Sequence, residues 1–317
     1  MTTKVSICIP TYCQTQYLKR TLDAILFQDY GDYEVVITDD SPDETVEALV
    51  REYEFGSKLT YVRNKVNLGS PANWNKAVML SRGEYIKILH HDDWFSSPSS
   101  LSEYVQMLDS DSTAGFAFSG ATVRMATSGK TWHHHASDRQ INRLRSEPTC
   151  LFYNNFIGPP SSTIIRRSAF IAYRENLKWF VDIAHYIQIL QNTRFVATKK
   201  PLITSTTRAS HQITNACLEN SQLNMYECFY LFDEIKYLIP DETRHLYTNY
   251  LIKLIYRYKI RSVEAIRQSG YAGDLPVEVL PSLKTNWLFR RGKLLKLRIS
   301  RRFIALKESL QGLIHLL

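Results

Sequence analysis

The sequence lacks the features of a spanning or secreted protein. No apolar stretch of about 18 residues occurs among its 317 residues, so no membrane-spanning helix is expected. The N-terminus enters a strand-like run without the basic segment, apolar core and small-residue cleavage site of a secretory signal, so none is predicted. Glycine (12) and proline (11) are too few for a collagen-like or low-complexity chain.

Cysteine is also sparse. The five cysteines are an odd number, are scattered along the chain, and contain no Cys-x-x-Cys spacing. This pattern argues against a disulfide framework or a zinc ribbon and fits a reducing compartment. We therefore expect a cytoplasmic protein.

The composition of the sequence is typical of a folded globular protein. Hydrophobic residues make up 44% and charged residues 22%, with 19 Tyr, 14 Phe and 5 Trp, which argues against disorder. The net charge of +8 is unevenly spread: residues 241–317 hold 15 Lys and Arg against 6 Asp and Glu, and the rest holds 24 against 25. The basic character therefore belongs to the C-terminal region.

In the first 108 residues, segments with the hydrophobic pattern of strands alternate with segments that have the pattern of helices. Short apolar runs predict strands, and apolar residues spaced along one helical face, such as Leu18, Leu22, Ile25 and Leu26, predict helices. The predicted strands are residues 4–10, Glu34–Thr38, Leu59–Arg63 and Tyr85–Leu89, and the helices between them are Leu18–Leu26, Thr45–Tyr53 and Asn73–Leu80. This alternation predicts βαβ units and a mostly parallel sheet.

The pattern changes after residue 115. It predicts short strands at Phe116–Ser119, Ala121–Met125, Phe195–Thr198 and Leu202–Ser205, a helix at Phe180–Gln191, and a loop at Ser128–Asn142. From about Asn220 the chain is helix-like. We predict a catalytic domain of residues 1–215, with halves 1–108 and 109–215, and a helical, basic region of residues 216–317.

Three polar segments directly follow predicted strands. They are Pro10–Tyr12, Asp39–Asp40 and His90–Asp93, and the carboxyl ends of parallel strands are where open α/β sheets bind ligands. Two adjacent carboxylates at a strand end can hold Mg²⁺ or Mn²⁺ together with substrate phosphates. The alternatives for such Asp residues are a turn or a helix N-cap.

These segments also stand in a recognisable order. Ser6–Tyr12, Asp39–Ser41, Asn67–Asn75, Gly83–Tyr85 and His90–Asp93 resemble the inverting glycosyltransferases of family 2, whose fold is called GT-A. That family carries Asn-x-Gly followed by Arg-Asn, a Gly-Glu-Tyr strand start and an Asp-x-Asp-Asp metal motif. The resemblance is strong over residues 4–108 and traceable to about 215. It implies a mostly parallel α/β sheet flanked by helices, then a helical C-terminal region.

The resemblance implies a nucleotide-diphosphate sugar as donor and Mn²⁺ or Mg²⁺ as cofactor. The donor would be bound by Pro10, Thr11, Tyr12, Asp39, Asp40, Asn67, Asn75, His91 and Arg208. The metal would be held by Asp92, with His90 and His211. Two positions depart from the family pattern: His90 stands where the motif has its first Asp, and Trp74 stands where it has Arg. His90 could ligate Mn²⁺ or could mark a weaker dependence on metal.

An inverting transfer needs a carboxylate that deprotonates the acceptor hydroxyl. By resemblance Asp182, at the start of a predicted helix, is that base, and Glu175 is the reserve; a favourable interaction with the helix dipole is the structural alternative. Trp94, Trp132 and Trp179 are predicted on the acceptor side. The segment Trp132–His135 could stack on a sugar, act as a lid, or be a plain polar loop.

The tail beyond Lys284 mixes basic and bulky apolar residues, which is typical of an amphipathic helix on anionic lipid; packing on the catalytic domain is the alternative. We expect a peripheral membrane enzyme that transfers one sugar to a lipid-linked saccharide acceptor in surface polysaccharide or lipopolysaccharide synthesis, with no nucleic-acid partner. A non-catalytic nucleotide-sugar-binding relative is an alternative. A sugar-phosphate nucleotidyltransferase is a weaker one, because Pro10–Gln14 lacks glycine.

Overall fold

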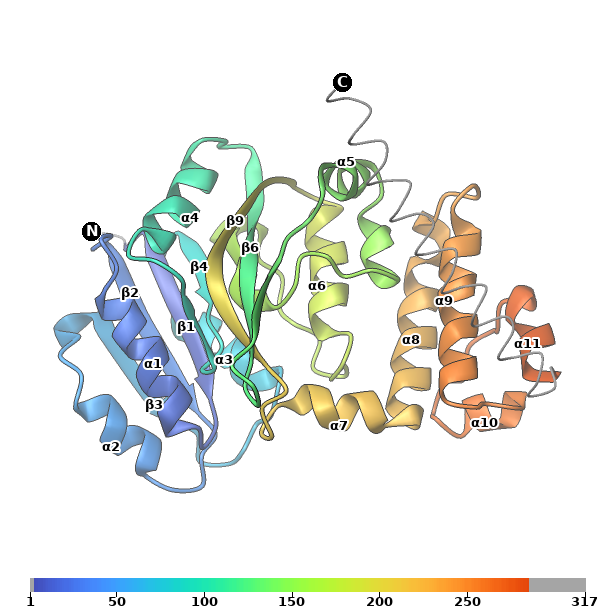
Figure 1. The fold of residues 1–317 in the computed structure, drawn as a ribbon, viewed down its shortest axis with the longest axis horizontal. Helices are drawn as coiled ribbons and strands as arrows, with labels where there is room; N and C mark the ends of the chain where they lie inside the picture. Colours follow the sequence, from blue (N-terminus) through green and yellow to red (C-terminus); the bar gives the residue numbers. More distant parts are fainter. Residues whose placement is uncertain (1–2, 285–317) are drawn as a thin grey trace. The chain divides into compact units, whose positions relative to one another are not determined.

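The computed structural model describes residues 3–284 (Figure 1). The chain divides into two compact units, Met1–Glu219 and Asn220–Leu317. Across residues 3–284, none of the helices is both long enough and apolar enough to cross a bilayer. The basic tail of residues 285–317, predicted to contact a membrane, lies outside the described residues.

The first unit begins with four parallel strands joined by helices. Their order across the sheet is β3-β2-β1-β4. The elements are β1 (Val5–Thr11), α1 (Thr15–Leu26), β2 (Tyr33–Asp39), α2 (Thr45–Arg51), β3 (Leu59–Arg63), α3 (Ala72–Leu80) and β4 (Tyr85–Ile88). The βαβ prediction for this half is confirmed, with boundaries shifted by at most three residues.

Alternate residues of β1 pack on opposite faces of this sheet. Val5, Ile7 and Ile9 join a buried core with residues of α1, α2 and α4, while Cys8 is equally buried and lies outside that core. Both faces are covered, as parallel sheets require. The predicted apolar face of α1 was wrong at Leu26, which is 48% exposed, because it lies in the last turn, beyond the buried stripe.

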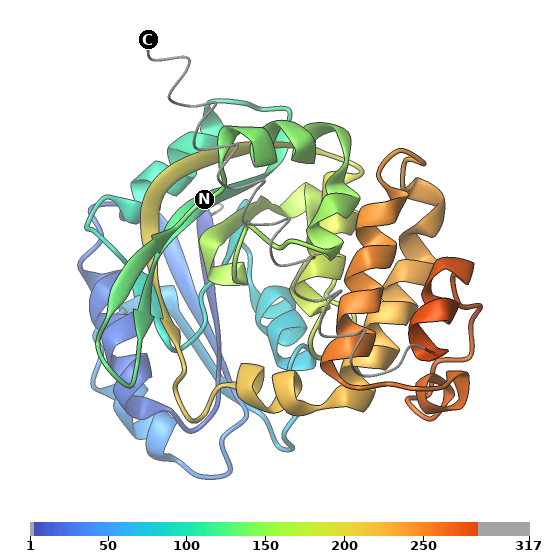
Figure 2. The ribbon, with the colours of Figure 1, turned by 45° about the vertical axis from the view of Figure 1, so that its right-hand side comes forward.

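The second half of the unit extends the same sheet with mixed strand directions. The order continues from β4 as β8-β6-β9-β5, with β7 paired to β6. Figure 2 shows β9 as a long curved strand, and β6 runs parallel beside it. The remaining elements are β5 (Asp93–Phe95), α4 (Ser100–Asp109), β6 (Ala114–Met125), β7 (Thr131–His134), α5 (Asp138–Ser146), β8 (Thr163–Arg166), α6 (Val181–Leu190), β9 (Arg194–Thr207) and α7 (Ile213–Glu219), with short 3₁₀ turns between them. The result is an α/β fold with a curled mixed sheet flanked by helices.

Three predictions for this half were wrong. The two short strands expected in residues 116–125 are one strand, β6, which passes through a register irregularity at Gly120. A side chain there would meet the backbone oxygen of Lys199 at 2.5 Å, so glycine permits the close approach of β9 rather than ending the strand. The two strands expected in residues 195–205 are likewise one, β9. The loop expected at Ser128–Asn142 contains β7 and the start of α5.

The second unit is helical over its described residues, as predicted. Its helices are α8 (Ser221–Ile235), α9 (Arg244–Arg257), α10 (Val263–Arg267) and α11 (Leu280–Lys284). Helices α8 and α9 pack together, and each buries apolar residues such as Phe229 and Leu251.

Candidate active site

The three polar segments predicted to converge do lie side by side. Thr11 is in register with Asp39, and the Asp40 amide donates to the Thr11 carbonyl at 3.0 Å. The imidazole Nδ1 of His91 lies 3.4 Å from the carbonyl oxygen of Pro10. The carboxyl ends of β1, β2 and β4 therefore form one edge, as the parallel topology requires.

A cavity of about 550 Å³ opens at this edge. Tyr12, which is 48% exposed, lies on it, and so do two cationic residues that the sequence analysis missed. The lining is Tyr12, Asp40, Ser41, Pro42, Arg63, Asn64, Lys65, Val66 and Asn67. Arg63 and Lys65 could have been found by the same rule that found Asp40, because they end and follow β3, the next parallel strand.

The paired carboxylates of β2 have different surroundings. Asp39 is fully buried and accepts hydrogen bonds from Ser41 and from the Tyr61 hydroxyl, at 2.6–2.9 Å. Asp40 borders the cavity and accepts from the Asn64 amide at 2.6 Å and from the backbone of residues 68 and 69 at 3.0 and 2.9 Å. Asp39 thus stabilises the end of β2. Contact of either carboxylate with a nucleotide-sugar donor stays a prediction.

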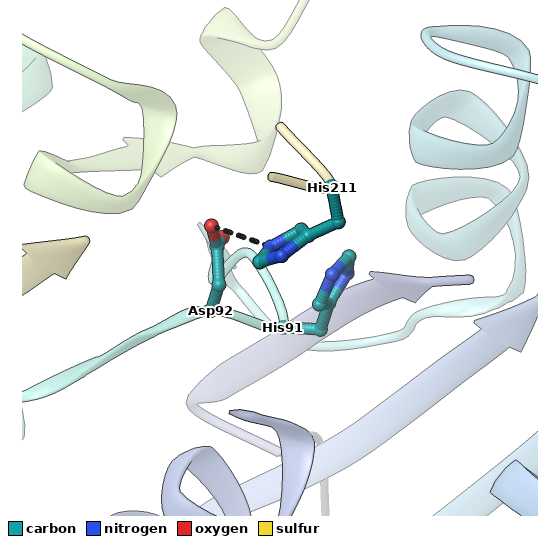
Figure 3. A group of neighbouring side chains, drawn as sticks. All are labelled: His91, Asp92 and His211. Atoms are coloured by element: carbon teal, nitrogen blue, oxygen red, sulfur yellow. Dashed lines mark hydrogen bonds and ion pairs between the residues drawn. The ribbon is translucent and has the colours of Figure 1, made fainter. Parts of the chain in front are cut away.

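A second group of side chains forms a potential metal site beyond β4. One ligand atom each from His91, Asp92 and His211 lie within 4.8 Å of one another, and Figure 3 shows the His211 ring directed at Asp92 with the His91 ring beside it. The Nε2 atom of His211 lies 3.2 Å from Oδ2 of Asp92. His90 belongs to a separate group, with Asp92 and Asp93, of the same compactness. The predicted partners His90 and His211 therefore approach Asp92 in different groups, and His91, predicted as a donor-binding residue, shares the group with His211.

The protonation states of this cluster suit a cation. Burial works to raise the pKa of the Asp92 carboxyl, but the hydrogen bond from His211 and the neighbouring imidazoles outweigh it, so the net shift is downward. Burial lowers the pKa of His90 to about 4 and also lowers that of His91. Nitrogen Nε2 of each of these two rings is buried without a hydrogen-bond partner. Neutral imidazoles and an ionised carboxylate are suitable ligands for Mn²⁺ and related ions, so the residues present fit a divalent metal.

The loop that carries this cluster is fixed by two distant elements. From α1, the hydroxyl of Thr21 lies 2.9 Å and 2.8 Å from the carbonyl oxygens of His91 and Asp93. From β9, the hydroxyl of Thr206 donates to the Asp92 carbonyl at 2.8 Å. Gln212 donates to the Asp92 carboxylate at 2.9 Å. Nothing in the sequence distinguishes these three residues except, for Gln212, its place next to His211.

The predicted base, Asp182, lies in the first turn of α6. Its carboxylate accepts from the Asn155 side chain at 3.1 Å and from the Ile183 amide at 2.9 Å. Burial raises the pKa of Asp182 to about 6, against these hydrogen bonds, which lower it. A carboxyl group with such a pKa can accept a proton near neutral pH. Glu175, the reserve candidate, is exposed and accepts from Asn75 at 3.1 Å.

Aromatic rings lead from the metal group toward Asp182. The His90 ring packs on Trp74 with centroids 4.7 Å apart, and Trp74 meets the Tyr173 ring edge-on at 5.2 Å. Burial, with a contribution from the charge of Asp182, raises the pKa of the Tyr173 hydroxyl. Asn75 fixes the backbone at Tyr173. Its side-chain amide donates to the Tyr173 carbonyl oxygen and accepts from the Tyr173 amide, both at 2.8 Å.

The remaining predicted residues lie on separate elements. Trp94, on the edge strand β5, is covered by the guanidinium of Arg20 at 4.8 Å. Trp132, on β7, is 42% exposed, and Trp179 is partly buried just before α6. Arg208 is exposed and has a left-handed backbone conformation (φ +60°) beyond β9. The three tryptophans come from different elements, and their acceptor-side role stays a prediction.

The sequence matches one family profile and several known proteins. The profile described as Glycosyl transferase family 2 matches residues 6–174. The putative colanic acid biosynthesis glycosyl transferase WcaA of Escherichia coli is 34% identical over 104 residues, 32% of this chain and 36% of that protein. The abequosyltransferase RfbV of Salmonella typhimurium is 35% identical over 101 residues, 30% of each chain. The chain spans less than two thirds of the first relatives it matches, at 61%, 40% and 36% of their lengths.

Comparison with solved structures supports the same fold. Residues 1–349 of S. aureus TarS, in complex with UDP-GlcNAc, match with a TM-score of 0.58 and 19% identity, over 92% of this chain and 80% of that one. The mannosyltransferase PcManGT of Pyrobaculum calidifontis, in complex with GDP-Man and Mn²⁺, matches with a TM-score of 0.54 and 18% identity, over 93% and 80%. At these identities the likeness shows the fold alone.

Proposed function

The chain belongs to glycosyl transferase family 2, and from this premise we propose that it transfers one sugar from a nucleotide-diphosphate sugar to an acceptor hydroxyl, with inversion at the anomeric carbon. The arrangement of the candidate site carries the proposal. The cavity and the potential metal group around Asp92 share one edge of the sheet. The rings of His90, Trp74 and Tyr173 lead from that group toward Asp182, whose pKa is raised.

The cavity at the ends of β1, β2 and β3 is the proposed nucleoside site. Tyr12 offers an exposed ring, and Asn67 and Asp40 offer polar groups, so base and ribose would have both a face and hydrogen-bonding partners. Arg63 and Lys65 give the lining positive charge, which suits an anionic ligand. Donor binding is supported by the solved neighbours, which contain UDP-GlcNAc and GDP-Man.

The proposed metal ligands are His91, Asp92 and His211. His90 lies close to the same Asp92 carboxylate, in a second group with Asp93. A divalent cation held there would supply positive charge to the departing diphosphate. Because imidazole nitrogen suits Mn²⁺ better than Mg²⁺, we propose that Mn²⁺ is the preferred ion.

Asp182 is the proposed general base. As the acceptor oxygen forms its bond to the anomeric carbon, the bond from that carbon to the diphosphate oxygen breaks, and the hydroxyl proton passes to a carboxylate oxygen of Asp182. Asn155 and the Ile183 amide hold that carboxylate in one orientation. The two aspartates would therefore have separate roles. The ionised Asp92 would bind the metal, and Asp182, whose pKa is raised, would accept the proton of the acceptor hydroxyl.

For the acceptor we propose a saccharide, lipid-linked and at the cytoplasmic membrane face, in surface polysaccharide synthesis. The names of the relatives WcaA and RfbV support this class. The excess of basic residues after residue 240 supports attraction to anionic lipid.

The test is donor turnover across nucleotide sugars of several bases, with Mn²⁺, Mg²⁺ or EDTA. It compares wild type with Asp92→Asn and with the control Asp241→Asn, an exposed aspartate in the second unit. We expect one donor to be consumed in Mn²⁺, with turnover lost in EDTA and in Asp92→Asn but kept in the control. Turnover unaffected by EDTA would overturn the metal assignment. A donor that binds but is not turned over, even with saccharide acceptors added, would identify a non-catalytic binding protein.

A further inference from the structure

One wall of the 550 Å³ cavity is a loop of residues 64–69, here called the cavity loop. It directly follows Arg63, the last residue of β3. Both of its ends are bound to the Asp40 carboxylate: the Asn64 side chain donates to it at 2.6 Å, and the backbone amides of residues 68 and 69 donate at 3.0 and 2.9 Å. A single buried carboxylate therefore fixes the loop at both ends.

The first end of the cavity loop also belongs to a buried polar network. The Asn64 side chain donates to the side-chain oxygen of Asn73 at 3.0 Å and accepts from Lys76 at 2.5 Å. Asn73, which is buried at the start of α3, donates in turn to the Thr38 carbonyl at 3.0 Å. The polar atoms of Asn64 are thus used within the protein, and this residue supports the cavity without being available to a ligand.

Most of the hydrogen-bonding capacity of Asp40 is used in the same way. An ionised carboxylate offers about four acceptor positions. The Asn64 side chain and the amide of residue 68 both donate to Oδ1, and the amide of residue 69 donates to Oδ2. The contacts on the page therefore make Asp40 a positioning residue for the cavity loop.

The middle of the cavity loop is different, because its side chains face outward. Lys65, Val66 and Asn67 are exposed and line the cavity. Arg63 lines it too, but its guanidinium lies 3.6 Å from the Glu44 carboxylate. Within residues 3–284, Lys65 has no acidic partner. Lys65 is therefore the cation of the lining that is available to a ligand.

A lysine in this place distinguishes two classes of nucleotide base. Uracil, thymine and guanine present a keto oxygen, which accepts hydrogen bonds, where cytosine and adenine present an amino group, which donates them. The Lys65 ammonium has three donors and no acceptor, so it can bind the keto oxygen but not the amino group. Asn67 carries both a donor and an acceptor and can suit either class.

We propose that Lys65 selects a nucleotide whose base carries a keto group over one whose base carries an amino group, and that Asp40 acts by holding the cavity loop in place. Lys65 is then a specificity-determining residue and Asp40 a positioning residue. This inference rests on the proposed function, because it assigns the class of base in the proposed donor.

The test uses two pairs of nucleoside diphosphates whose bases differ only between a keto and an amino form, UDP against CDP and IDP against ADP. Dissociation constants are measured by calorimetric titration in Mn²⁺, and the ratio within each pair cancels the shared contribution of ribose and diphosphate. We expect the keto member of each pair that binds to bind about 3- to 10-fold more tightly, the usual contribution of one hydrogen bond.

Two substitutions at the exposed Lys65 test its role. Lys65→Met keeps the chain length but removes the donors, so most of the keto preference should be lost. Lys65→Glu replaces donors by acceptors and should shift the ratio toward the amino member. Lys130→Met, at an exposed lysine in the turn between β6 and β7, is the matched control and should keep the wild-type ratio.

A double-mutant cycle tests the role of Asp40. Asp40→Asn cannot accept all three hydrogen bonds, so the loop should be released and the keto preference should fall. Adding Lys65→Met to Asp40→Asn should then change the ratio little, because Lys65 acts only from a fixed loop. In the wild type, hydrogen exchange should show the amides of residues 68 and 69 to be protected, a measurement that does not depend on the folding of Asp40→Asn.

Each outcome has a separate meaning. If the wild type binds neither pair, nor GDP or dTDP, the proposed function fails and this inference fails with it. If it binds UDP or IDP no more tightly than the amino partner, or if Lys65→Met keeps the wild-type ratio, only the selection by Lys65 is overturned. Independent effects of Asp40→Asn and Lys65→Met on the ratio, or unprotected amides at residues 68 and 69, would overturn the positioning role of Asp40.

Discussion

Two aspartates in the first unit have the same side chain and opposite electrostatics. Asp92 follows β4 and is surrounded by His211, Gln212 and two further imidazoles, which together outweigh burial and lower its pKa. Asp182 begins α6 and accepts its hydrogen bonds from uncharged groups, the Asn155 side chain and the backbone, so burial prevails and raises its pKa to about 6. The difference shows that the imidazoles around Asp92, and not the number of its hydrogen bonds, favour its charged form, whereas the buried Asp182 can exchange a proton.

The two regions also differ in how they are assembled. Asp92 is carried by a loop whose backbone is fixed by α1 and β9, far away in sequence. Asp182 is fixed by its own helix start and by Asn155, which lies 27 residues before it. Substitutions near Asp92 should therefore change ligand binding, and substitutions near Asp182 should change proton transfer.

Asp182→Asn removes the proton acceptor and should have the largest effect. We expect kcat to fall by about 10² to 10⁴-fold, the usual contribution of a general base. The dissociation constant for the nucleoside diphosphate should not change, since Asp92 and the cavity are intact. Steady-state kinetics and calorimetric titration measure the two quantities, and a kcat within a few fold of wild type would move the base to another residue.

Gln212→Ala removes a hydrogen bond to the Asp92 carboxylate without removing a proposed ligand. Such supporting partners usually contribute about 10- to 100-fold to metal affinity, so the Mn²⁺ dissociation constant should rise by that range. Saturating Mn²⁺ should restore most of the turnover. Gln268→Ala, at an exposed residue of the second unit, is the control. An unchanged Mn²⁺ affinity would show that Gln212 does not support the metal group.

The pH profile of the wild type tests the raised pKa directly. Asp182 accepts a proton only when ionised, so kcat/KM should be constant above the pKa of about 6 and fall as the pH drops below it. One pH unit below that value the rate should be about one tenth of the plateau. A rate that stays flat down to pH 5 would contradict the assignment, provided that circular dichroism shows the fold intact.

Asn155→Ala should give the smallest effect. The hydrogen bond from Asn155 lowers the pKa of Asp182, so its loss should raise that pKa and move the acidic limb of the profile to higher pH. We expect a loss of about 2- to 5-fold at pH 6, since one hydrogen bond is worth about 1 kcal/mol, and near-normal rates at pH 8. A profile displaced to lower pH would show that Asn155 acts in some other way.

The fold was predictable where contacts are local. In the parallel half, each strand and helix is specified by its own periodicity, and the boundaries of β3 were predicted residue for residue. The prediction failed for β6 and β9 because each runs through polar or glycine residues, such as Gly120, that are tolerated only when the partner strand is present. Strand length there depends on pairing between residues about 80 apart, which no local pattern contains.

The candidate site follows the same division. Strand-end residues such as Tyr12 and Asp40 were found because parallel topology alone brings them to one edge. The grouping of His91 with His211 was not found, since it depends on where β9 ends relative to β4. Gln212 and Thr206 were missed because side chains that donate to a carboxylate or to a backbone carbonyl leave no periodic signal.

By itself the sequence determined the alternating α/β order, the polar strand ends and the family motifs, because periodicity and turn chemistry act over a few residues. Only the tertiary structure decided that His90 packs on Trp74, that His91 joins Asp92 and His211, and that Asp92 and Asp182 differ in pKa. The physical reason is that burial and electrostatic environment are sums over neighbours from distant segments, and those neighbours exist only after the chain has folded.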